Sequence, residues 1–363
     1  MILIIIVLSV PSVNADEINT SAAAYSLYCP DNGELILSEN ADKELPIAST
    51  TKIMTAILTL EEAAHNNRVV EFTEEMSAEG SSMYLKRGEK VTLYDLAVGM
   101  MMQSGNDAAN AAALTLSDSF EDFAALMNDK ARRLGMEHTH FVTPSGLDDE
   151  EHYSTVSDMA LLMAYAMQNE DFSYITSQTS MEVHFLYPAD KFVTYPNHNK
   201  LLRMYESCIG GKTGYTDKAG RCLVSAAESD GMTLIAVTLD DRDDWNDHIA
   251  LYEYGFSHYE KRIVGNDSFT LDAVGGESDE VKVYSAESSV VVPKDSPELK
   301  TRVNLPTFLY APVKRGEQVG TIEYSLKGEA LVEIPLTADE TIEYNLQKRS
   351  LFTYIKDILN WHS

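Results

Sequence analysis

Apolar and polar positions in the first part of the chain follow two periodicities. Two short apolar runs, 22–28 and 34–38, flank a Pro-Asp-Asn-Gly turn and predict a β-hairpin. The segment from Ser49 to about Ala64 is apolar on most faces of a helical projection. It therefore predicts a helix that lies buried at the centre of a domain.

Between residues 93 and 170 the apolar residues recur at spacings of three and four, in segments separated by polar loops. This spacing predicts a group of helices. Strand patterns return further along the chain, at 208–216, 221–227 and 232–239. One more helix is expected at about 245–255. Together these patterns predict a domain, residues 22–258, in which helices cover a sheet and a helical insertion interrupts it.

After residue 262 the pattern changes to short alternating segments separated by turns that contain Gly or Pro. Alternation with a period of two is typical of half-buried strands. The strand-like segments are VKVYS, SVVV, TFLYAPV, QVGTIEYSL and ALVEIPL. We therefore expect a small all-β domain at 262–346, resembling a β-sandwich.

Both ends of the chain carry apolar segments of a different kind. Residues 1–15 combine an apolar run with a small-x-small ending at Ala15, which is typical of a signal peptide, although no Lys or Arg precedes the run. Residues 347–363 gather large apolar side chains on one helical side and hold three Lys or Arg against one Asp. They span only about 22 Å as a helix. This favours a helix lying in a membrane interface, with a terminal helix packed on the β domain as the alternative.

Composition narrows the classes of function. The 363 residues include 44% hydrophobic and 23% charged residues, which is typical of a globular protein with two domains. The formal net charge is −29, which argues against a nucleic-acid partner because such proteins present basic surfaces. The three Cys residues (Cys29, Cys208 and Cys222) are too few for a disulfide framework and are interpreted as packing residues. No Cys or His spacing typical of a metal site is present, so no metal is expected.

The stretch ASTTKIMT places Ser49 and Lys52 three residues apart, on one face of the predicted helix. A neutral Ser needs a base to act as a nucleophile, and a buried Lys can be neutral and accept its proton. The free backbone N–H of Ser49 could also stabilise an oxyanion. Taken alone, however, the pattern is also explained by Ser49 as an ordinary helix N-cap.

Two further motifs add to this pattern. QSGNDAA at 103–109 places Ser104 and Asn106 between two predicted helices. CIGGKTGYT at 208–216 has three Gly residues in a predicted strand, which allows another backbone to approach closely. Lys212 and Thr213 in that strand offer a cation and a hydroxyl to the carboxylate of a peptide laid along it. A polar turn and a hairpin turn are the plain alternatives for these two motifs.

In this order, Ser-x-x-Lys, Ser-Gly-Asn and Lys-Thr-Gly resemble the motif set of penicillin-binding proteins. The chain is most similar to the low-molecular-mass D-alanyl-D-alanine carboxypeptidases, and the resemblance also includes residues 141–155 and 240–256. It implies an α/β (α+β) transpeptidase domain with an antiparallel sheet, followed by a β domain and an amphipathic anchor helix. It also implies export and a peripheral position on the outer face of the cytoplasmic membrane.

The resemblance further implies roles for individual residues. Ser49 would be acylated by the penultimate D-Ala of peptidoglycan stem peptides, and Lys52 would be its base. Ser104 would relay a proton to the leaving amine, while Asn106 would hold the substrate amide or Lys52. The carboxylate would bind Lys212 and Thr213, next to Gly214, and the N–H of Tyr215 would complete the oxyanion hole. β-Lactam antibiotics would bind covalently as inhibitors, and no cofactor is implied.

One departure and several alternatives follow from the comparison with the family. Tyr215 stands where many relatives have His, so we expect a change in substrate preference rather than in chemistry. His198 and Arg242 fall in segments that the family places near the cleft, but each could equally be a surface residue. A β-lactamase would need an activating Glu, and Glu150 and Glu151 lack the surrounding sequence. A D,D-endopeptidase and a non-enzymatic penicillin-binding scaffold remain as other functions.

Overall fold

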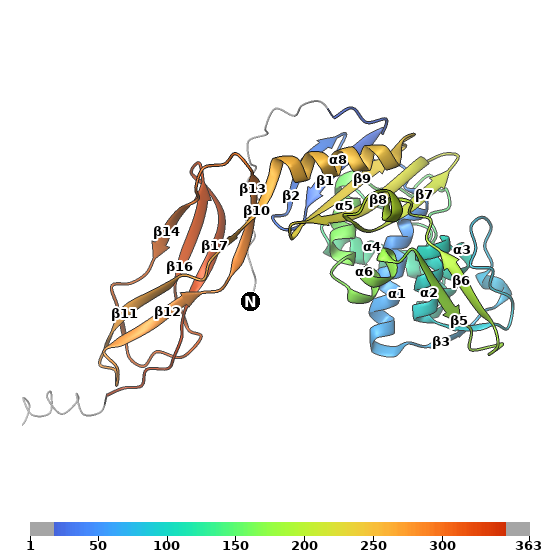
Figure 1. Ribbon diagram of the computed structural model, residues 1–363. Helices are drawn as coiled ribbons and strands as arrows, with labels where there is room; N and C mark the ends of the chain where they lie inside the picture. Colours follow the sequence, from blue (N-terminus) through green and yellow to red (C-terminus); the bar gives the residue numbers. More distant parts are fainter. Residues whose placement is uncertain (1–17, 346–363) are drawn as a thin grey trace, which may run out of the picture. The chain divides into compact units, whose positions relative to one another are not determined.

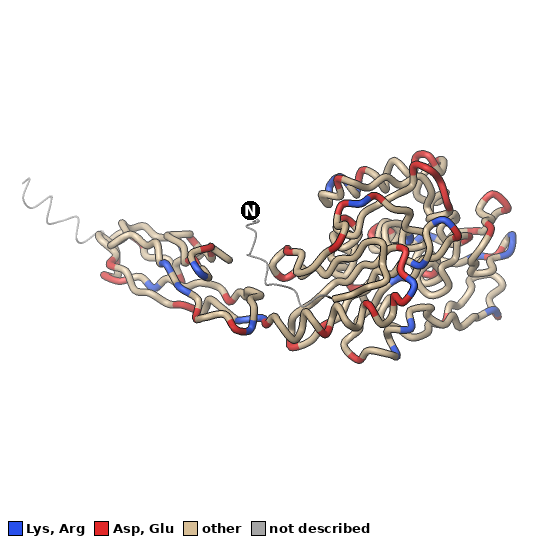
Figure 2. The backbone as a smooth tube through the Cα atoms, turned by 90° about the horizontal axis from the view of Figure 1, so that it is seen from above, with Lys and Arg blue, Asp and Glu red and all other residues tan. Residues whose placement is uncertain are grey.

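The computed structural model describes residues 18–345, which divide into two compact units between His258 and Tyr259 (Figure 1). The predicted signal peptide at 1–15 and the predicted anchor helix at 347–363 lie outside the described residues. Within residues 18–345, no helix has the length and apolar character needed to cross a membrane. Acidic residues outnumber basic ones along both units, in keeping with the negative net charge (Figure 2).

The first unit is built on a five-stranded sheet in which every neighbouring pair is antiparallel. The strands, in spatial order, are β2 (Glu34–Glu39), β1 (Ala24–Cys29), β9 (Met232–Leu239), β8 (Gly220–Ser229) and β7 (Cys208–Thr216). All five were predicted from their patterns. Because β1 pairs with β9, a strand from the beginning of this unit lies beside a strand from near its end. All the helices between them in the sequence therefore form an insertion between two neighbouring strands.

Helices cover both faces of this sheet (Figure 1). Ser26 of β1 donates a hydrogen bond to the carbonyl of Val156 at the start of α5 (Val156–Ala166). Its neighbour Leu27 faces Gly255 of α8 (Asp244–His258), where a Cβ would lie 3.0 Å from Leu27 Cδ2. Successive strand residues point to opposite faces, so α5 and α8 lie on opposite sides of the sheet.

A helical layer beside α5 surrounds α1 (Lys52–Asn66), whose Ile53, Met54, Ile57 and Leu60 are buried. The layer was predicted from spacing, and α1 is central because apolar residues occupy most of its faces. The other helices of the layer are α2 (Leu93–Gln103), α3 (Asn106–Leu116), α4 (Phe120–Arg133) and α6 (Glu170–Ser177). Of these, α6 was not predicted.

Several short elements were also missed by the sequence analysis. They are η2 (Glu74–Met76), β3 (Val69–Glu71), β4 (Lys90–Thr92), β5 (Ser180–His184), β6 (Phe192–Pro196) and α7 (Leu201–Met204). The strands form two separate hairpins, β3 with β4 and β5 with β6. Three to five residues with at most one buried position leave too little periodicity to recognise.

The second unit consists of strands, as predicted. Its six-stranded sheet has the order β14-β16-β17-β12-β11-β15, and β10 pairs with β13. The bounds are β10 (Tyr259–Val264), β11 (Ser268–Val274), β12 (Glu280–Ser285), β13 (Ser288–Pro293), β14 (Lys300–Asn304), β15 (Phe308–Tyr310), β16 (Gln318–Leu326) and β17 (Glu329–Ala338). The sequence analysis missed β10, β11 and β14.

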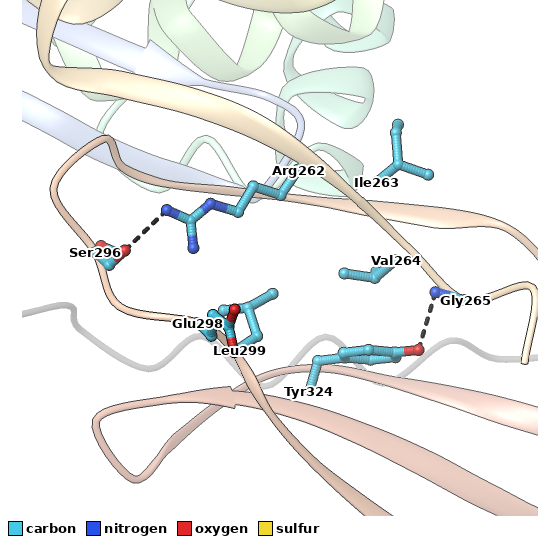
Figure 3. Close-up of a pocket in the computed structure, with 8 residues that line it drawn as sticks. All are labelled: Arg262, Ile263, Val264, Gly265, Ser296, Glu298, Leu299 and Tyr324. Carbon is cyan, nitrogen blue, oxygen red and sulfur yellow. Dashed lines mark hydrogen bonds between the residues drawn. The ribbon is translucent and has the colours of Figure 1, made fainter.

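A cavity of about 540 Å³ opens in the second unit, between β10, β16 and the segment before β14 (Figure 3). At one end, Arg262 donates hydrogen bonds to Glu260 and to the carbonyls of Ser296 and Pro297. At the other end, the Tyr324 hydroxyl accepts a hydrogen bond of 3.0 Å from the N–H of Gly265. The guanidinium of Arg262 is therefore occupied within the unit, and its bonds tie β10 to the segment that precedes β14.

The three Cys residues are free and buried, as the sequence analysis expected. The β7–β8 register places Cys222 opposite Gly214. Cys208 lies opposite Ala227 in the same register, so the two cysteines of this hairpin are separated along the strands.

Candidate active site

Ser49 lies in a 3₁₀ turn, η1 (Ala48–Thr51), immediately before α1. The expectation that the α-helix begins at Ser49 was therefore wrong, since α1 begins at Lys52, and Ile47 and Thr51 rather than Ser49 are the N-cap residues of η1 and α1. Side chains three residues apart eclipse in a 3₁₀ turn, which stacks Ser49 on Lys52. Ala48 has φ +46°, a left-handed conformation that costs energy and is typical of functional turns.

Lys52 lies directly beneath Ser49. Its side chain is fully buried, and its Nζ lies 2.9 Å from Ser49 Oγ. The same amine donates a 2.6 Å hydrogen bond to the carbonyl of Ser145. Burial holds the pKa of Lys52 well below its usual value, and the nearby Lys212 lowers it further against an opposing effect of Asp107. A neutral Lys52 at this distance is placed to accept the Ser49 proton.

The loop at 141–155 packs along the start of α1 and fixes this geometry. Thr55 donates to the carbonyl of Pro144 at 2.6 Å. His152 Nδ1 accepts from the N–H groups of Val142 and Thr143, so its Nε2 carries the proton and donates to Thr51 Oγ1 at 2.8 Å. The loop thus contacts Thr51, Lys52 and Thr55, where the η1 turn leads into α1.

Ser104 and Lys212 form the second hydrogen-bonded pair. Ser104 ends α2 in a left-handed conformation with φ +56°, which turns its side chain away from the helix. Lys212 Nζ on β7 donates to Ser104 Oγ at 2.9 Å and to the carbonyl of Thr213 at 2.7 Å. Burial lowers the pKa of Lys212 to about 7. This lysine can therefore gain or lose its proton near neutral pH.

Strand β7 approaches the Ser49 turn at Gly214. A Cβ at Gly214 would lie 2.9 Å from the backbone nitrogen of Ser49 and 3.0 Å from that of Thr50. Only a residue without a side chain allows this contact. The next residue, Tyr215, is 62% exposed, and its hydroxyl donates to Asp217 at 3.0 Å. The Tyr215 side chain therefore points away from the buried pairs.

These elements enclose a cleft of about 340 Å³. Seven of the predicted site residues meet at it or directly beneath it: Ser49, Ser104, Thr213, Gly214 and Tyr215 line it, with Lys52 and Lys212 behind them. The sequence analysis did not select five other lining residues, namely Ser81, Lys200, Arg221, Asp244 and Trp245. Of these, Arg221 had a signal, because the predicted β7–β8 hairpin places it near Tyr215.

Known proteins share this fold. A family model described as D-alanyl-D-alanine carboxypeptidase matches residues 11–243. The chain belongs to this carboxypeptidase family. A second model, the C-terminal domain of penicillin-binding protein 5, matches residues 260–344. The first unit is therefore a penicillin-binding transpeptidase domain, and the second is the β domain that accompanies it in that protein.

Relatives match over nearly the whole chain. D-alanyl-D-alanine carboxypeptidase DacC of Escherichia coli is 34% identical, with 90% of this chain and 85% of that protein covered. DacF of Bacillus subtilis is 29% identical, with 94% and 90% covered. The structure of penicillin-binding protein 5 from Haemophilus influenzae matches with a TM-score of 0.73 at 27% identity, covering 90% of this chain and 98% of that one.

Asn106 of the family's central motif has a different position from its neighbours. Its Nδ2 donates to the carbonyl of Glu79 at 2.7 Å, and its backbone N–H donates to Ser81 at 2.8 Å. Among the described residues, Asn106 Oδ1 is buried without a hydrogen-bond partner, and Lys52 does not bond to it. Asn106 therefore fixes the loop that carries Ser81 into the cleft and leaves one acceptor unused.

The two residues that the family resemblance left open are placed differently. His198 lines the cleft, and its pKa is lowered first by burial and then by Lys212. Arg242 is exposed and does not line the cleft. Glu150 and Glu151 are also exposed and outside the cleft, so neither is placed to activate a water for a β-lactamase.

Proposed function

We propose that the chain is a serine-type D-Ala-D-Ala carboxypeptidase, which removes the terminal D-Ala from peptidoglycan pentapeptide stems through an acyl-enzyme on Ser49. The observation that carries the proposal is the pairing of Ser49 with Lys52 and of Ser104 with Lys212 on two walls of one cleft. Family membership supports the same activity, penicillin binding and a role in peptidoglycan maturation.

Acylation begins when Ser49 Oγ attacks the carbonyl carbon of the penultimate D-Ala. The neutral amine of Lys52 takes the Ser49 proton as the new C–O bond forms. The N–H groups of Ser49 and Tyr215 stabilise the negative oxygen of the tetrahedral intermediate, where Gly214 keeps the strand and the turn close. Lys212 and Thr213 hold the terminal carboxylate.

Breakdown of the intermediate breaks the C–N bond and releases the terminal D-Ala. Its amine receives, by way of Ser104, the proton that Lys52 took from Ser49, and Lys52 is neutral again; Ser104 Oγ is held in place by the hydrogen bond from Lys212. Water then attacks the ester carbonyl, with Lys52 again accepting a proton, and regenerates free Ser49. A β-lactam follows the same first step and leaves a covalent adduct on Ser49.

Mass spectrometry of the intact protein tests the proposal directly. We expect one penicilloyl adduct on Ser49 and release of one D-Ala from a pentapeptide that ends in D-Ala-D-Ala. Ser49→Ala should remove the adduct, while Ser38→Ala, in the exposed half of β2, should keep it. The absence of any adduct on the wild-type protein would contradict the mechanism. An adduct without D-Ala release, combined with cleavage of cross-linked peptides, would indicate a D,D-endopeptidase instead.

We also propose that the protein is exported and held at the outer face of the cytoplasmic membrane through residues 347–363. The support is the sequence pattern at the two ends of the chain. A segment with apolar residues on one side and basic residues among its charges binds a membrane surface without crossing it.

Liposome flotation tests the anchor. The protein with residues 16–363 should float with anionic vesicles, and the protein that ends at residue 346 should stay at the bottom. Leu351→Glu and Ile355→Glu together should also abolish flotation if the apolar side inserts. Equal flotation of the full and shortened proteins would exclude this segment as the anchor.

A further inference from the structure

Arg221 occupies a wall of the cleft that has no role in the chemistry described so far. It lies on β8 directly opposite Tyr215 of β7, and Leu223 lies opposite Thr213. Directly opposite residues of an antiparallel pair project from the same face, and so do residues two apart on one strand. Arg221, Thr213 and Tyr215 therefore share one face of the sheet edge, and all three line the cleft.

The start of α8 fixes the orientation of Arg221. Its Nη2 donates a short hydrogen bond to Asp244, which is 2% exposed, and its guanidinium carbon lies 5.6 Å from the centre of the Trp245 ring. Trp245 in turn packs with Leu223 and Leu201. Charge pairing and stacking on a ring both favour a single orientation of a guanidinium. The Arg221 side chain is nevertheless 42% exposed, so it remains accessible from the cleft.

Arg221 also has hydrogen-bonding capacity left. A guanidinium offers five N–H donors. Among the described residues its Nη2 is bound to Asp244 and its Nε is buried without a partner, so the exposed part of the guanidinium, not Nε, is what a ligand can reach. Lys212, in contrast, already uses two of its three donors on Ser104 and the carbonyl of Thr213. Lys212 is thus a buried cation with most of its donors already bonded within the protein. Arg221 is a partly exposed planar donor group whose described hydrogen bond within the protein is the one to Asp244.

We propose that Arg221 is a specificity-determining residue that binds the free terminal carboxylate of the substrate together with Thr213, and that Asp244 and Trp245 are its positioning residues. A planar guanidinium can hold a carboxylate by two parallel hydrogen bonds, which an ammonium cannot do. The proposal rests on the carboxypeptidase function, in which the residue that is cleaved off carries the free carboxylate. It assigns to Arg221 a role for which the exposed Arg242 was one sequence candidate.

The test compares two probes that differ only in this carboxylate. Benzylpenicillin carries the free acid, and its methyl ester does not. In Arg221→Gln, the second-order rate constant for acylation of Ser49 should fall about 10- to 100-fold with the acid, since a charged hydrogen bond contributes about 1.5–3 kcal/mol. With the ester the rate constant should fall less than about 3-fold, because the ester has no carboxylate for Arg221 to bind in the wild-type protein either.

Two control variants each remove one positive charge near the cleft but keep the guanidinium of Arg221. Lys218→Gln alters an exposed residue of the same hairpin, which binds the carbonyl of Asp149 and does not line the cleft. Lys200→Gln removes an exposed cation from the cleft wall. Both should leave the ratio of acid to ester rates near the wild-type value. Arg221→Lys should restore only part of the preference for the acid, because it returns charge without the planar geometry.

The outcomes separate this inference from the proposed function. An equal fall for acid and ester in Arg221→Gln would overturn it and leave Arg221 as a structural link between β8 and α8. An unchanged ratio of acid to ester rates in folded Arg221→Gln would also overturn the inference. If Arg221→Gln does not fold, the ratio measured in Arg221→Lys decides, and a wild-type ratio there overturns the inference. Failure of the wild-type protein to acylate with either probe would instead contradict the carboxypeptidase itself.

Discussion

Lys52 and Lys212 are both buried, yet the reaction needs them in opposite charge states. Lys52 must be neutral to take the Ser49 proton, and Lys212 must be a cation to hold a carboxylate. Burial lowers the pKa of both, that of Lys212 to about 7. The positive charge of Lys212 lowers the pKa of Lys52 further. A cationic Lys212 therefore keeps its neighbour neutral, and an incoming carboxylate in turn stabilises the cation.

The pH dependence of the two steps should separate the lysines. Lys212 is protonated below a pKa of about 7 and neutral above it. We therefore expect the KM for a D-Ala-D-Ala pentapeptide to rise as the pH increases from 6 to 9, because carboxylate binding loses its charge. Acylation by a penicillin ester, which needs only neutral Lys52, should not slow over that range. Steady-state and acylation rates at each pH measure the two trends. A KM that stays constant up to pH 9 would contradict the assignment to Lys212.

His152 should act on the site through the turn that it holds. His152→Ala leaves the buried N–H groups of Val142 and Thr143 without their acceptor, and each such group costs about 1–3 kcal/mol. We expect Tm to fall by at least about 4 °C and acylation of Ser49 to slow. His140→Ala is the control, because this half-buried ring has one side-chain hydrogen bond among the described residues, to the carbonyl of Glu151, and accepts none from the loop backbone. Equal unfolding curves for the two variants would show that His152 does not support the loop.

At the scale of elements, the decisive contact is that of strand β7 with the η1 turn. Gly214→Ala would force a methyl group to within 2.9 Å of the Ser49 nitrogen, and backbone on both sides prevents a cheap adjustment. We expect acylation by benzylpenicillin to fall by at least about 100-fold, the cost typical of a disturbed oxyanion site. Circular dichroism should remain that of the folded protein. Gly231→Ala, in the turn between β8 and β9, is the control, because its added Cβ meets no atom within 4 Å and the cost is only that of replacing a glycine at φ +73°.

A Gly214→Ala variant that acylates at the wild-type rate would contradict this account of the oxyanion site. It would show that the turn can move away from β7 without loss of geometry. A variant that is unfolded would instead place the contact among the determinants of stability, and the rate measured for any folded fraction would then decide.

The long elements could be predicted from the sequence because their periodicity reflects burial. The helix α1 and the strands β7 to β9 have enough apolar positions to reveal both type and extent. The η1 turn could not be predicted in this way. Ala48 adopts φ +46° because Gly146 and Gly214, distant in sequence, both approach this segment. A Cβ at Gly146 would lie 1.9 Å from the Ala48 carbonyl, and such tertiary contacts leave no local pattern.

The part of the site that belongs to the three sequence motifs could be predicted. Residue types and spacing selected Ser49, Lys52, Ser104 and Lys212, which need a hydroxyl, an amine or a cation at fixed positions. Arg221 was missed because its role depends on a hairpin register and on a helix start more than twenty residues away. Motifs identify the groups that react, whereas the walls of the cleft come from packing between elements.

At the scale of the whole molecule, the two units have separate hydrophobic cores within the described residues. The main core of the first unit extends from Ala24 to Leu239, and the cores of the second lie between Val264 and Ile342. All residues that line the cleft belong to the first unit. A unit with its own core can fold alone. The β domain is therefore not expected to contribute to the chemistry.

Separating the units tests this expectation. A protein of residues 16–258, which ends with α8, should acylate with benzylpenicillin within about 3-fold of the rate of the full chain, because every cleft residue and its supporting contacts remain. Residues 259–345 should give their own unfolding transition in calorimetry, and the full chain should show both transitions, since cooperative unfolding follows the separate cores. If the shortened protein folds but acylates more than about 10-fold slower, the β domain must act on the cleft. In that case the independence of the two cores would not extend to function.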